Sequence, residues 1–232
     1  MNAQLPLTLR WPAQQRIATF VRGANAAAVA LLETTTHDAA AAWVFLSGAA
    51  GSGKTHLLIG ACAQAVTHGR SAQYLALAKL AGDRAAAVRA FGGSDLLALD
   101  DVHALAGDAT AENALFDLYN RCKVEKSTLL FAALAPPGQC GFGLPDLVSR
   151  LSACAQVVLK PLDEAARRAW LHTRAQARGL ALDDAVLDWL FAHHARDLGS
   201  LAALLERIDR EALAAQRRVT VPFLRSLLGG GA

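Results

Sequence analysis

The sequence holds few residues suited to disulfides or structural metal sites. Its four cysteines, Cys62, Cys122, Cys140 and Cys154, lie far apart and include no C-x-x-C pair, and the seven histidines form no H-E-x-x-H motif. Disulfide scaffolds and zinc sites need closer, patterned spacings. We therefore expect buried or isolated thiols and no disulfide framework.

Long apolar runs and clusters of like charge are also missing. No stretch approaches the roughly 18 consecutive apolar residues of a membrane-spanning helix, and the first residues lack the pattern of a signal peptide. These absences predict a cytoplasmic protein with no membrane partner. The 23 Lys and Arg residues exceed the 20 Asp and Glu residues by only 3 and are scattered, so tight electrostatic DNA binding by this chain alone is not indicated.

Short apolar runs alternate with longer helical patterns in the first two thirds of the chain. The hydrophobic fraction of 53% over 232 residues is ample for a sizeable core. This alternation predicts an α/β domain with a parallel sheet covered by helices. We expect strands at 43–47, 73–77, 95–100, 127–134 and 156–160, and helices at 55–67, 79–90, 110–124 and 145–152.

The strand signal stops after Pro161. The segment that follows begins with acidic residues and ends in Gly179, as a capped helix does. Amphipathic stretches at about 183–195 and 197–217 come next, and TVPFLRSLL predicts a short last helix. Residues 161–232 are therefore expected to form a small all-helical domain behind an α/β domain of residues 11–160.

The octapeptide GAAGSGKT, residues 48–55, matches the phosphate-binding pattern G-x-x-x-x-G-K-[ST] in full. Gly48, Gly51 and Gly53 would let backbone N–H groups wrap around phosphates. Lys54 would reach the β and γ phosphates, and the Thr55 hydroxyl would hold Mg²⁺. An expected strand leads into the loop and an expected helix leads out, which would place the phosphates at a helix N-terminus. The sequence therefore predicts a nucleotide site.

A pair of acids ends the third expected strand, in LLALDD. Asp100 would bind Mg²⁺, directly or through water, and Asp101 could orient or polarise an attacking water as a catalytic group. The alternative is a solvated acid pair at the end of a strand. At the end of the fourth strand, neither Leu134 nor Ala135 has a side chain that could hydrogen-bond a γ phosphate. We therefore expect at most weak ATPase activity from this chain alone.

Taken together, these motifs resemble the bacterial DnaA family of AAA+ ATPases. The resemblance rests on GAAGSGKTHLL, LALDDVHALAGD, LFDLYNR, GLPDLVSRL and the helical tail. LFDLYNR at 115–121, GLPDLVSRL at 143–151 and AAQRRVTVPFLRSLL at 214–228 are closer still to the Hda branch, whose members inactivate the initiator after replication begins. DnaA continues beyond its lid into a helix-turn-helix domain, whereas this sequence stops at Ala232. The implied fold is a P-loop AAA+ αβα sandwich with a five-stranded parallel sheet, followed by a helical lid.

The resemblance also gives a role to the hexapeptide QLPLTL at residues 4–9. Hda-like sequences begin with a Q-L-x-L-x-L motif that binds the DNA polymerase III sliding clamp, the β subunit. Gln4 would make the specifying hydrogen bonds, while Leu5, Leu7 and Leu9 would enter an apolar pocket of the clamp. Residues 1–10 are thus expected to be a clamp-binding tail. Composition alone leaves open an N-terminal strand or a stretch packed on its own domain.

The resemblance further implies chemistry in trans. Arg150, in LPDLVSRL, matches the arginine finger that would stabilise charge at the γ phosphate of ATP bound to DnaA. For one arginine in a helix, the alternative is a solvent contact or a surface ion pair. The lid arginine of AAA+ proteins aligns with Gly199 here, and Arg196, three residues earlier, could replace it on the same helix face. The departures at Leu134 and Gly199 favour holding ADP or ATP over rapid turnover.

The implied function is negative regulation of replication initiation. The protein would bind the clamp and promote hydrolysis of DnaA-bound ATP, would reach DNA mainly through the clamp, and would self-associate as AAA+ proteins commonly do. Two other interpretations are open. An autonomous P-loop ATPase of helicase-loader or transposition-helper type would use Asp101 in cis and need no QLPLTL. A DNA-binding initiator-like protein would bind DNA tightly and salt-sensitively without the clamp.

Overall fold

The computed structural model describes residues 11–12, 15–194, 198–215 and 217–228. The chain divides into two compact units, and the main division falls between Lys160 and Pro161; Ala50–Ser52 are grouped with the second unit. Within the described ranges, no helix combines the length and the apolar character that crossing a membrane requires.

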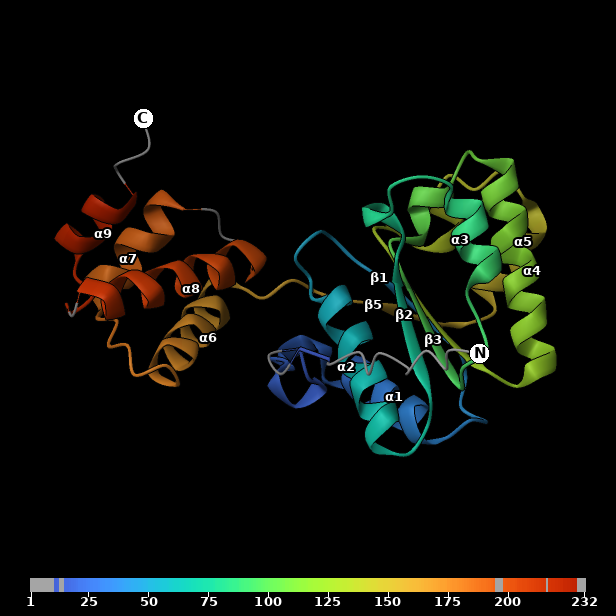
Figure 1. Cartoon of the computed structure of the whole chain (residues 1–232), viewed down its shortest axis with the longest axis horizontal. Helices are drawn as coiled ribbons and strands as arrows, with labels where there is room; N and C mark the ends of the chain where they lie inside the picture. Colours follow the sequence, from blue (N-terminus) through green and yellow to red (C-terminus); the bar gives the residue numbers. More distant parts are fainter. Residues whose placement is uncertain (1–10, 13–14, 195–197, 216, 229–232) are drawn as a thin grey trace, which may run out of the picture. The chain divides into compact units, whose positions relative to one another are not determined.

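The first unit is built on a five-stranded parallel sheet (Figure 1). Its strands are β1 (Val44–Ser47), β2 (Ala72–Ala76), β3 (Leu96–Asp100), β4 (Thr128–Ala133) and β5 (Ala155–Val158), in the order β2-β3-β4-β1-β5. Every expected strand is present, with ends shifted by at most two residues. Because β4 lies between β1 and β3, the strand before the phosphate loop and the strand that ends in Asp100 are separated by one neighbour.

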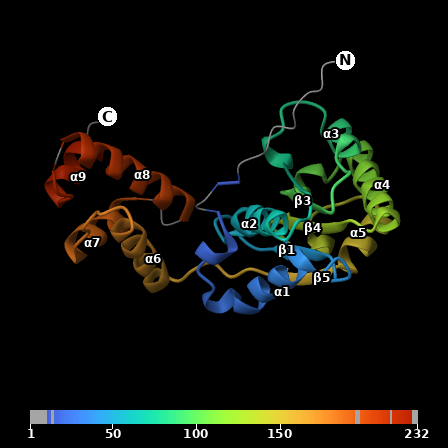
Figure 2. The same cartoon turned by 60° about the horizontal axis from the view of Figure 1, so that its bottom comes forward.

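Helices cover both faces of this sheet (Figure 2). α1 (Ala26–His37) and α2 (Lys54–Thr67) lie on one face, and α3 (Arg84–Ala90), α4 (Ala109–Glu125) and α5 (Pro145–Ser152) lie on the other. Alternate strand residues serve the two layers: Phe45 and Phe131 pack with α3, α4 and α5, whereas Leu46 and Leu130 pack with α1 and α2. A parallel sheet covered in this way needs strands that are apolar on both faces. The expected αβα sandwich is confirmed.

One expected helix begins later than the sequence pattern predicts, and one helix was not expected. In place of a helix over 79–90, Leu77–Lys79 form a 3-10 turn and α3 starts after Asp83, which caps it by accepting from the Ala86 N–H. Gly82, at φ +104°, adopts a backbone conformation incompatible with a continuing helix. No element was expected over residues 26–37, which form α1.

The second unit is helical. It contains α6 (Glu164–Gln176), α7 (Asp184–His193), α8 (Leu198–Ala215) and α9 (Val221–Leu228). Asp163 and Asp183 cap α6 and α7 by accepting hydrogen bonds from backbone N–H groups in their first turns. The helices share one apolar core, whose members include Leu171, Leu190, Leu205 and Leu224. The expected helical part after Pro161 is therefore present.

Asn25 joins the chain before α1 to the residues that follow β5. Its Nδ2 donates to the Lys160 carbonyl oxygen at 2.8 Å, and its Oδ1 accepts from the Lys160 N–H at 2.9 Å. Asn25 is 4% exposed, so its amide depends on these bonds instead of water. The paired bonds fix the last residue of the α/β unit to a segment 135 positions earlier in the sequence.

Asn25→Ala should lower the free energy of unfolding by about 2 kcal/mol, because it removes two hydrogen bonds of about 1 kcal/mol each. Urea denaturation followed by circular dichroism measures the change. Asn113→Ala is the matched control. Asn113 is exposed on α4, and within the described part of the chain its side chain bonds to the Ala109 carbonyl of its own helix, so its effect should stay within about 0.5 kcal/mol. Equal losses in the two variants would show that the Lys160 contacts contribute nothing.

Candidate nucleotide-binding site

The phosphate loop connects β1 to α2, and its backbone requires glycine. Gly48, Gly51 and Gly53 all have positive φ, at +152°, +74° and +95°, where a side chain would be strained. At Gly53 a Cβ would also lie 2.5 Å from Cε2 of Phe20. α2 begins at Lys54, so the unpaired N–H groups of its first turn immediately follow the loop, as in phosphate sites at helix N-termini.

The ammonium of Lys54 is turned back onto this loop. Its Nζ donates to the carbonyl oxygens of Gly48 at 2.6 Å and Ala49 at 2.9 Å, and Lys54 is 6% exposed. Burial lowers the pKa of this amine, although the nearby carboxylates oppose the shift. The Ser52 hydroxyl of the same loop is buried and has no hydrogen-bond partner within the described residues. A buried cation held by neutral carbonyls, beside an unpartnered hydroxyl, fits a loop that receives anionic oxygens.

Asp100 is the central acceptor of the site and is 1% exposed. Its Oδ2 accepts from the Thr55 hydroxyl at 2.6 Å and from the Tyr74 hydroxyl at 2.8 Å, and its Oδ1 accepts from the Asp101 N–H at 3.0 Å. The two residues predicted to bind Mg²⁺, Thr55 and Asp100, are therefore in direct contact. Mg²⁺ is bound through oxygen, often by one or two carboxylates together with phosphates, so this pair fits the ion.

Tyr74 of β2 is a site residue that the sequence analysis did not identify. Burial, followed by the charge of Asp100, raises the pKa of its hydroxyl, which therefore stays protonated and donates to the carboxylate. A single tyrosine in a strand gives no sequence signal for this role. Its partner becomes apparent only from the pairing of β2 with β3, in which Ala76 lies opposite Asp100.

Asp101 follows β3 in the left-handed conformation, with φ 57° and ψ 43°. Few residues other than glycine adopt it, and such strain is concentrated at functional sites. Burial and the neighbouring Asp100 raise the pKa of the Asp101 carboxyl, outweighing the opposite effects of His103 and Lys54. A carboxyl group with a raised pKa beside a phosphate loop has the properties of a general base for water.

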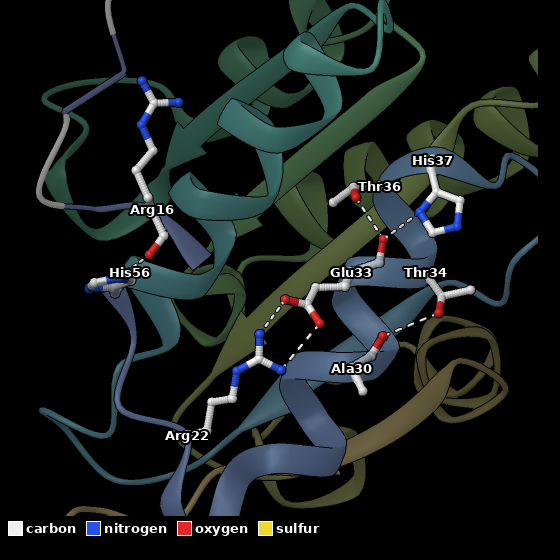
Figure 3. Close-up of polar contacts among 8 residues, drawn as sticks. All are labelled: Arg16, Arg22, Ala30, Glu33, Thr34, Thr36, His37 and His56. Atoms are coloured by element: carbon white, nitrogen blue, oxygen red, sulfur yellow. Dashed lines mark hydrogen bonds and ion pairs between the residues drawn. The ribbon is translucent and has the colours of Figure 1, made fainter. Parts of the chain in front are cut away.

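The 16–25 segment lies against the start of α2 (Figure 3). His56 Nε2 donates to the Arg16 carbonyl oxygen at 2.9 Å, and the His56 ring meets the edge of the Phe20 ring at a centroid distance of 5.5 Å. Arg22 pairs with both carboxylate oxygens of Glu33 on α1, at 2.5 and 3.3 Å. The contacts of His56 hold the segment against the first turn of α2, which follows the phosphate loop, and the Arg22–Glu33 pair holds it to α1.

The end of β4 offers no polar side chain. Leu134 follows β4 directly and is 49% exposed, and the next residue is Ala135. β4 lies between the strand that leads into the phosphate loop and the strand that ends in Asp100. The strand between the phosphate loop and Asp100 is therefore followed by two apolar side chains, at the place where the sequence predicts no polar group for the γ phosphate.

Arg150 lies in the last turn of α5, and its guanidinium contacts α4. Its Cζ is 5.4 Å from the ring centroid of Phe116 and 5.6 Å from that of Tyr119. Arg150 is partly exposed, and its guanidinium makes cation–π contacts with both rings. The other predicted residues, Gln4, Leu5, Leu7, Leu9 and Arg196, lie outside the described residues.

Comparisons with known proteins agree with this geometry. The model of the bacterial DnaA ATPase domain matches residues 13–157, and the model of the Hda lid domain matches residues 163–228. Domain III of the replication initiation protein DnaA from Thermotoga maritima has a similar structure, with a TM-score of 0.77, 21% identity, and coverage of 95% of this chain and 98% of that one. AMPPCP-bound DnaA from Aquifex aeolicus has a TM-score of 0.70 and 21% identity, with coverage of 89% of this chain and 69% of that one. The RuvB Holliday junction branch migration motor from Thermotoga maritima has a TM-score of 0.67 and 17% identity, with coverage of 94% of this chain and 72% of that one.

Asp101→Asn should raise the thermal unfolding midpoint at pH 7 by about 1–3 °C. A raised pKa means that the folded state disfavours the charged carboxyl, and asparagine removes that charge while tolerating the left-handed backbone. Unfolded chains ionise near pH 3.9, so the gain should shrink below about pH 4, where Asp101 is protonated in both states. Differential scanning calorimetry at pH 7 and pH 3 checks this, with exposed Asp117→Asn on α4 as the control. A gain that persisted at pH 3 would contradict the electrostatic cause.

Proposed function

Because the chain belongs to the bacterial DnaA family of AAA+ ATPases and has an Hda-type lid, we propose that it regulates replication initiation by promoting hydrolysis of ATP bound to DnaA. The lid match carries this proposal. DnaA itself has an ATPase domain, so the match over residues 13–157 does not distinguish an initiator from its regulator. The match over residues 163–228 does, because it is to the lid of the regulator.

The chain's own site would hold ADP or ATP with Mg²⁺. Lys54 would exchange its bonds to loop carbonyls for phosphate oxygens, and the N–H groups at the start of α2 would hold the same phosphates. Thr55 and Asp100 would hold Mg²⁺, which supplies charge neutralisation at the phosphates. The AMPPCP-bound structure of a relative supports a nucleotide ligand. Arg196 of the lid would add a cation to this site.

Arg150 would act on the nucleotide of a second protein. A guanidinium that approaches the γ phosphate of DnaA-bound ATP would stabilise the charge that develops during phosphoryl transfer. Its partial exposure and its contacts with rings, instead of a carboxylate, support this role. Leaving a cation–π contact at an exposed site costs about 0.5–1 kcal/mol, so the arginine is held in place without being locked there.

Gln4, Leu5, Leu7 and Leu9 would recruit the protein to the DNA polymerase III sliding clamp. Clamp binding would place Arg150 where DNA has just been copied, and contact with DNA would be mainly through the clamp. A peptide with one polar anchor and three leucines provides the alternation that extended peptides use in apolar grooves. We propose residues 1–10 as this tail, 11–160 as the nucleotide-binding base and 161–232 as the lid.

One observation favours a second candidate, an autonomous P-loop ATPase. Asp101 has the raised pKa and the strained backbone of a catalytic base. Such an enzyme would hydrolyse ATP without DnaA or the clamp. The side chains of Leu134 and Ala135 at the end of β4 count against rapid turnover, because neither can orient a γ phosphate or a water.

Lys54→Ala should weaken ADP–Mg²⁺ binding by roughly 10- to 100-fold, because hydrogen bonds to a charged group contribute about 1.5–3 kcal/mol. Isothermal titration calorimetry measures the affinity. Lys123→Ala, at an exposed lysine in the last turn of α4, is the matched control and should leave the affinity unchanged. Equal affinities in all three proteins would rule out the phosphate loop as the nucleotide site.

Arg150→Ala should reduce the stimulation of DnaA-bound ATP hydrolysis by roughly a thousandfold, the lower range for arginine fingers. The assay follows release of labelled phosphate from DnaA with clamp loaded on DNA. Arg150→Lys should be nearly as defective, because lysine lacks the planar fork. Arg89→Ala on α3 is the control for the loss of an exposed arginine.

Gln4→Ala separates the two halves of the proposal. If the clamp recruits the protein, this variant should lose the stimulation of DnaA-bound ATP hydrolysis at low protein concentration in the assay with clamp loaded on DNA. Full stimulation by Gln4→Ala and loss by Arg150→Ala would remove the clamp from the mechanism and keep the finger. Full stimulation by both variants, or substantial ATP turnover by the chain alone, would favour the autonomous ATPase.

A further inference from the structure

Glu112 is a buried carboxylate that, among the residues the structure describes, accepts hydrogen bonds from three backbone N–H groups. It lies in the first turn of α4 and is 2% exposed. Its Oε1 accepts from the Gly107 N–H at 2.8 Å and from the Gly143 N–H at 3.1 Å, and its Oε2 accepts from the Leu144 N–H at 2.8 Å. Burial of a charge is costly unless donors of this kind satisfy it, so the three bonds depend on one another.

These donors come from two loops with different places in the proposed function. Gly107 ends the short connection that begins at Asp101, passes through the 3-10 turn Val102–Leu105, and leads to α4. Gly143 and Leu144 come immediately before α5, and Leu144 is its N-cap residue. One side chain therefore ties the connection after the nucleotide-site acids to the helix that bears Arg150.

A second contact between the same two helices completes the arrangement. Glu112, Phe116 and Tyr119 follow one another at spacings of four and three residues, so they lie along one face of α4. The carboxylate holds the start of α5, and the two rings hold Arg150 in its last turn. α5 is thus attached to α4 near both of its ends, and Glu112 is the attachment that also reaches the nucleotide side.

We propose that Glu112 is a positioning residue for Arg150, through which this chain's own bound nucleotide sets the placement of α5. The inference rests on the proposed function for the role of Arg150. A change in the connection after Asp101 moves the Gly107 N–H, and the carboxylate follows because a lost donor would leave a buried charge unsatisfied. The Gly143 and Leu144 N–H groups share that carboxylate, so the start of α5 moves with it.

The test compares wild type, Glu112→Gln and Glu125→Gln by amide hydrogen exchange, with and without ADP–Mg²⁺. Glutamine keeps the shape of Glu112 but presents an NH₂ group where one of the backbone N–H groups needs an acceptor. Glu125 is the exposed last residue of α4, so Glu125→Gln controls for the loss of one charge from the same helix. Calorimetry on each protein reports ADP affinity, and stimulation of DnaA-bound ATP hydrolysis is measured in parallel.

In wild type and Glu125→Gln, ADP–Mg²⁺ should slow exchange in the peptide that covers 143–152. In Glu112→Gln, exchange at Gly143 and Leu144 should be at least about tenfold faster without ligand. ADP should bind with unchanged affinity but no longer alter that peptide. Stimulation of DnaA should fall by roughly 10- to 100-fold, as expected for a misplaced catalytic group.

Two results would overturn the inference: wild-type α5 that does not respond to ADP, or a response in Glu112→Gln as large as in wild type. If wild type fails to stimulate DnaA but the ADP response still requires Glu112, the proposed function fails and the coupling stands. If Glu112→Gln does not fold, Glu112→Asp replaces it. That variant keeps the charge but shortens the side chain by one methylene, and it should lose the ADP response in the same way.

Discussion

The hydrogen bond from the Thr55 hydroxyl to Asp100 is the interaction on which the candidate site depends. It joins the first turn of α2 to the end of β3, 45 residues away in sequence, at 2.6 Å. The parallel sheet makes this possible, because the carboxyl ends of all five strands lie at one edge. Since Asp100 is buried, its charge is tolerated only with donors, and Tyr74 and the Asp101 N–H supply the rest. The geometry that would hold Mg²⁺ is therefore also what makes the buried acid stable.

This arrangement separates holding a nucleotide from hydrolysing it. The groups proposed to contact phosphate and metal come from the loop after β1, the end of β3 and the start of α2, and Thr55 contacts Asp100 directly. Hydrolysis needs a further group that recognises the γ phosphate, and the residue that follows the strand between β1 and β3 is Leu134. If the site bound nucleotide and hydrolysed it slowly, as proposed, it would remain in one state for long periods. That property suits a nucleotide whose role is to set a conformation.

The sequence predicted the parts of the site that local patterns encode. The phosphate loop has a fixed spacing, and the alternation of apolar runs predicted all five strands and placed Asp100 at a strand end. Asn25 and Glu112 escaped prediction for a shared physical reason. Their partners are backbone groups of Lys160, Gly107, Gly143 and Leu144, and a backbone N–H or carbonyl carries no residue type that a sequence could display. The late start of α3 has a different origin, because a helical composition was overridden by Gly82 and the Asp83 cap.

α4 carries more of the mechanism than its surface composition suggests. Its first turn binds the connection from Asp101, and the same face then supports Arg150 one and two turns later. A rigid helix converts a small displacement at Glu112 into a change at the start of α5, whereas the rings at Phe116 and Tyr119 allow the guanidinium to slide. Cation–π contacts tolerate such movement because they depend weakly on exact position, unlike the three short bonds to the carboxylate. The geometrically strict contacts of Glu112 therefore lie toward the nucleotide site, and the tolerant ring contacts lie at Arg150, which would meet the partner. A signal from this chain's site to Arg150 requires this arrangement.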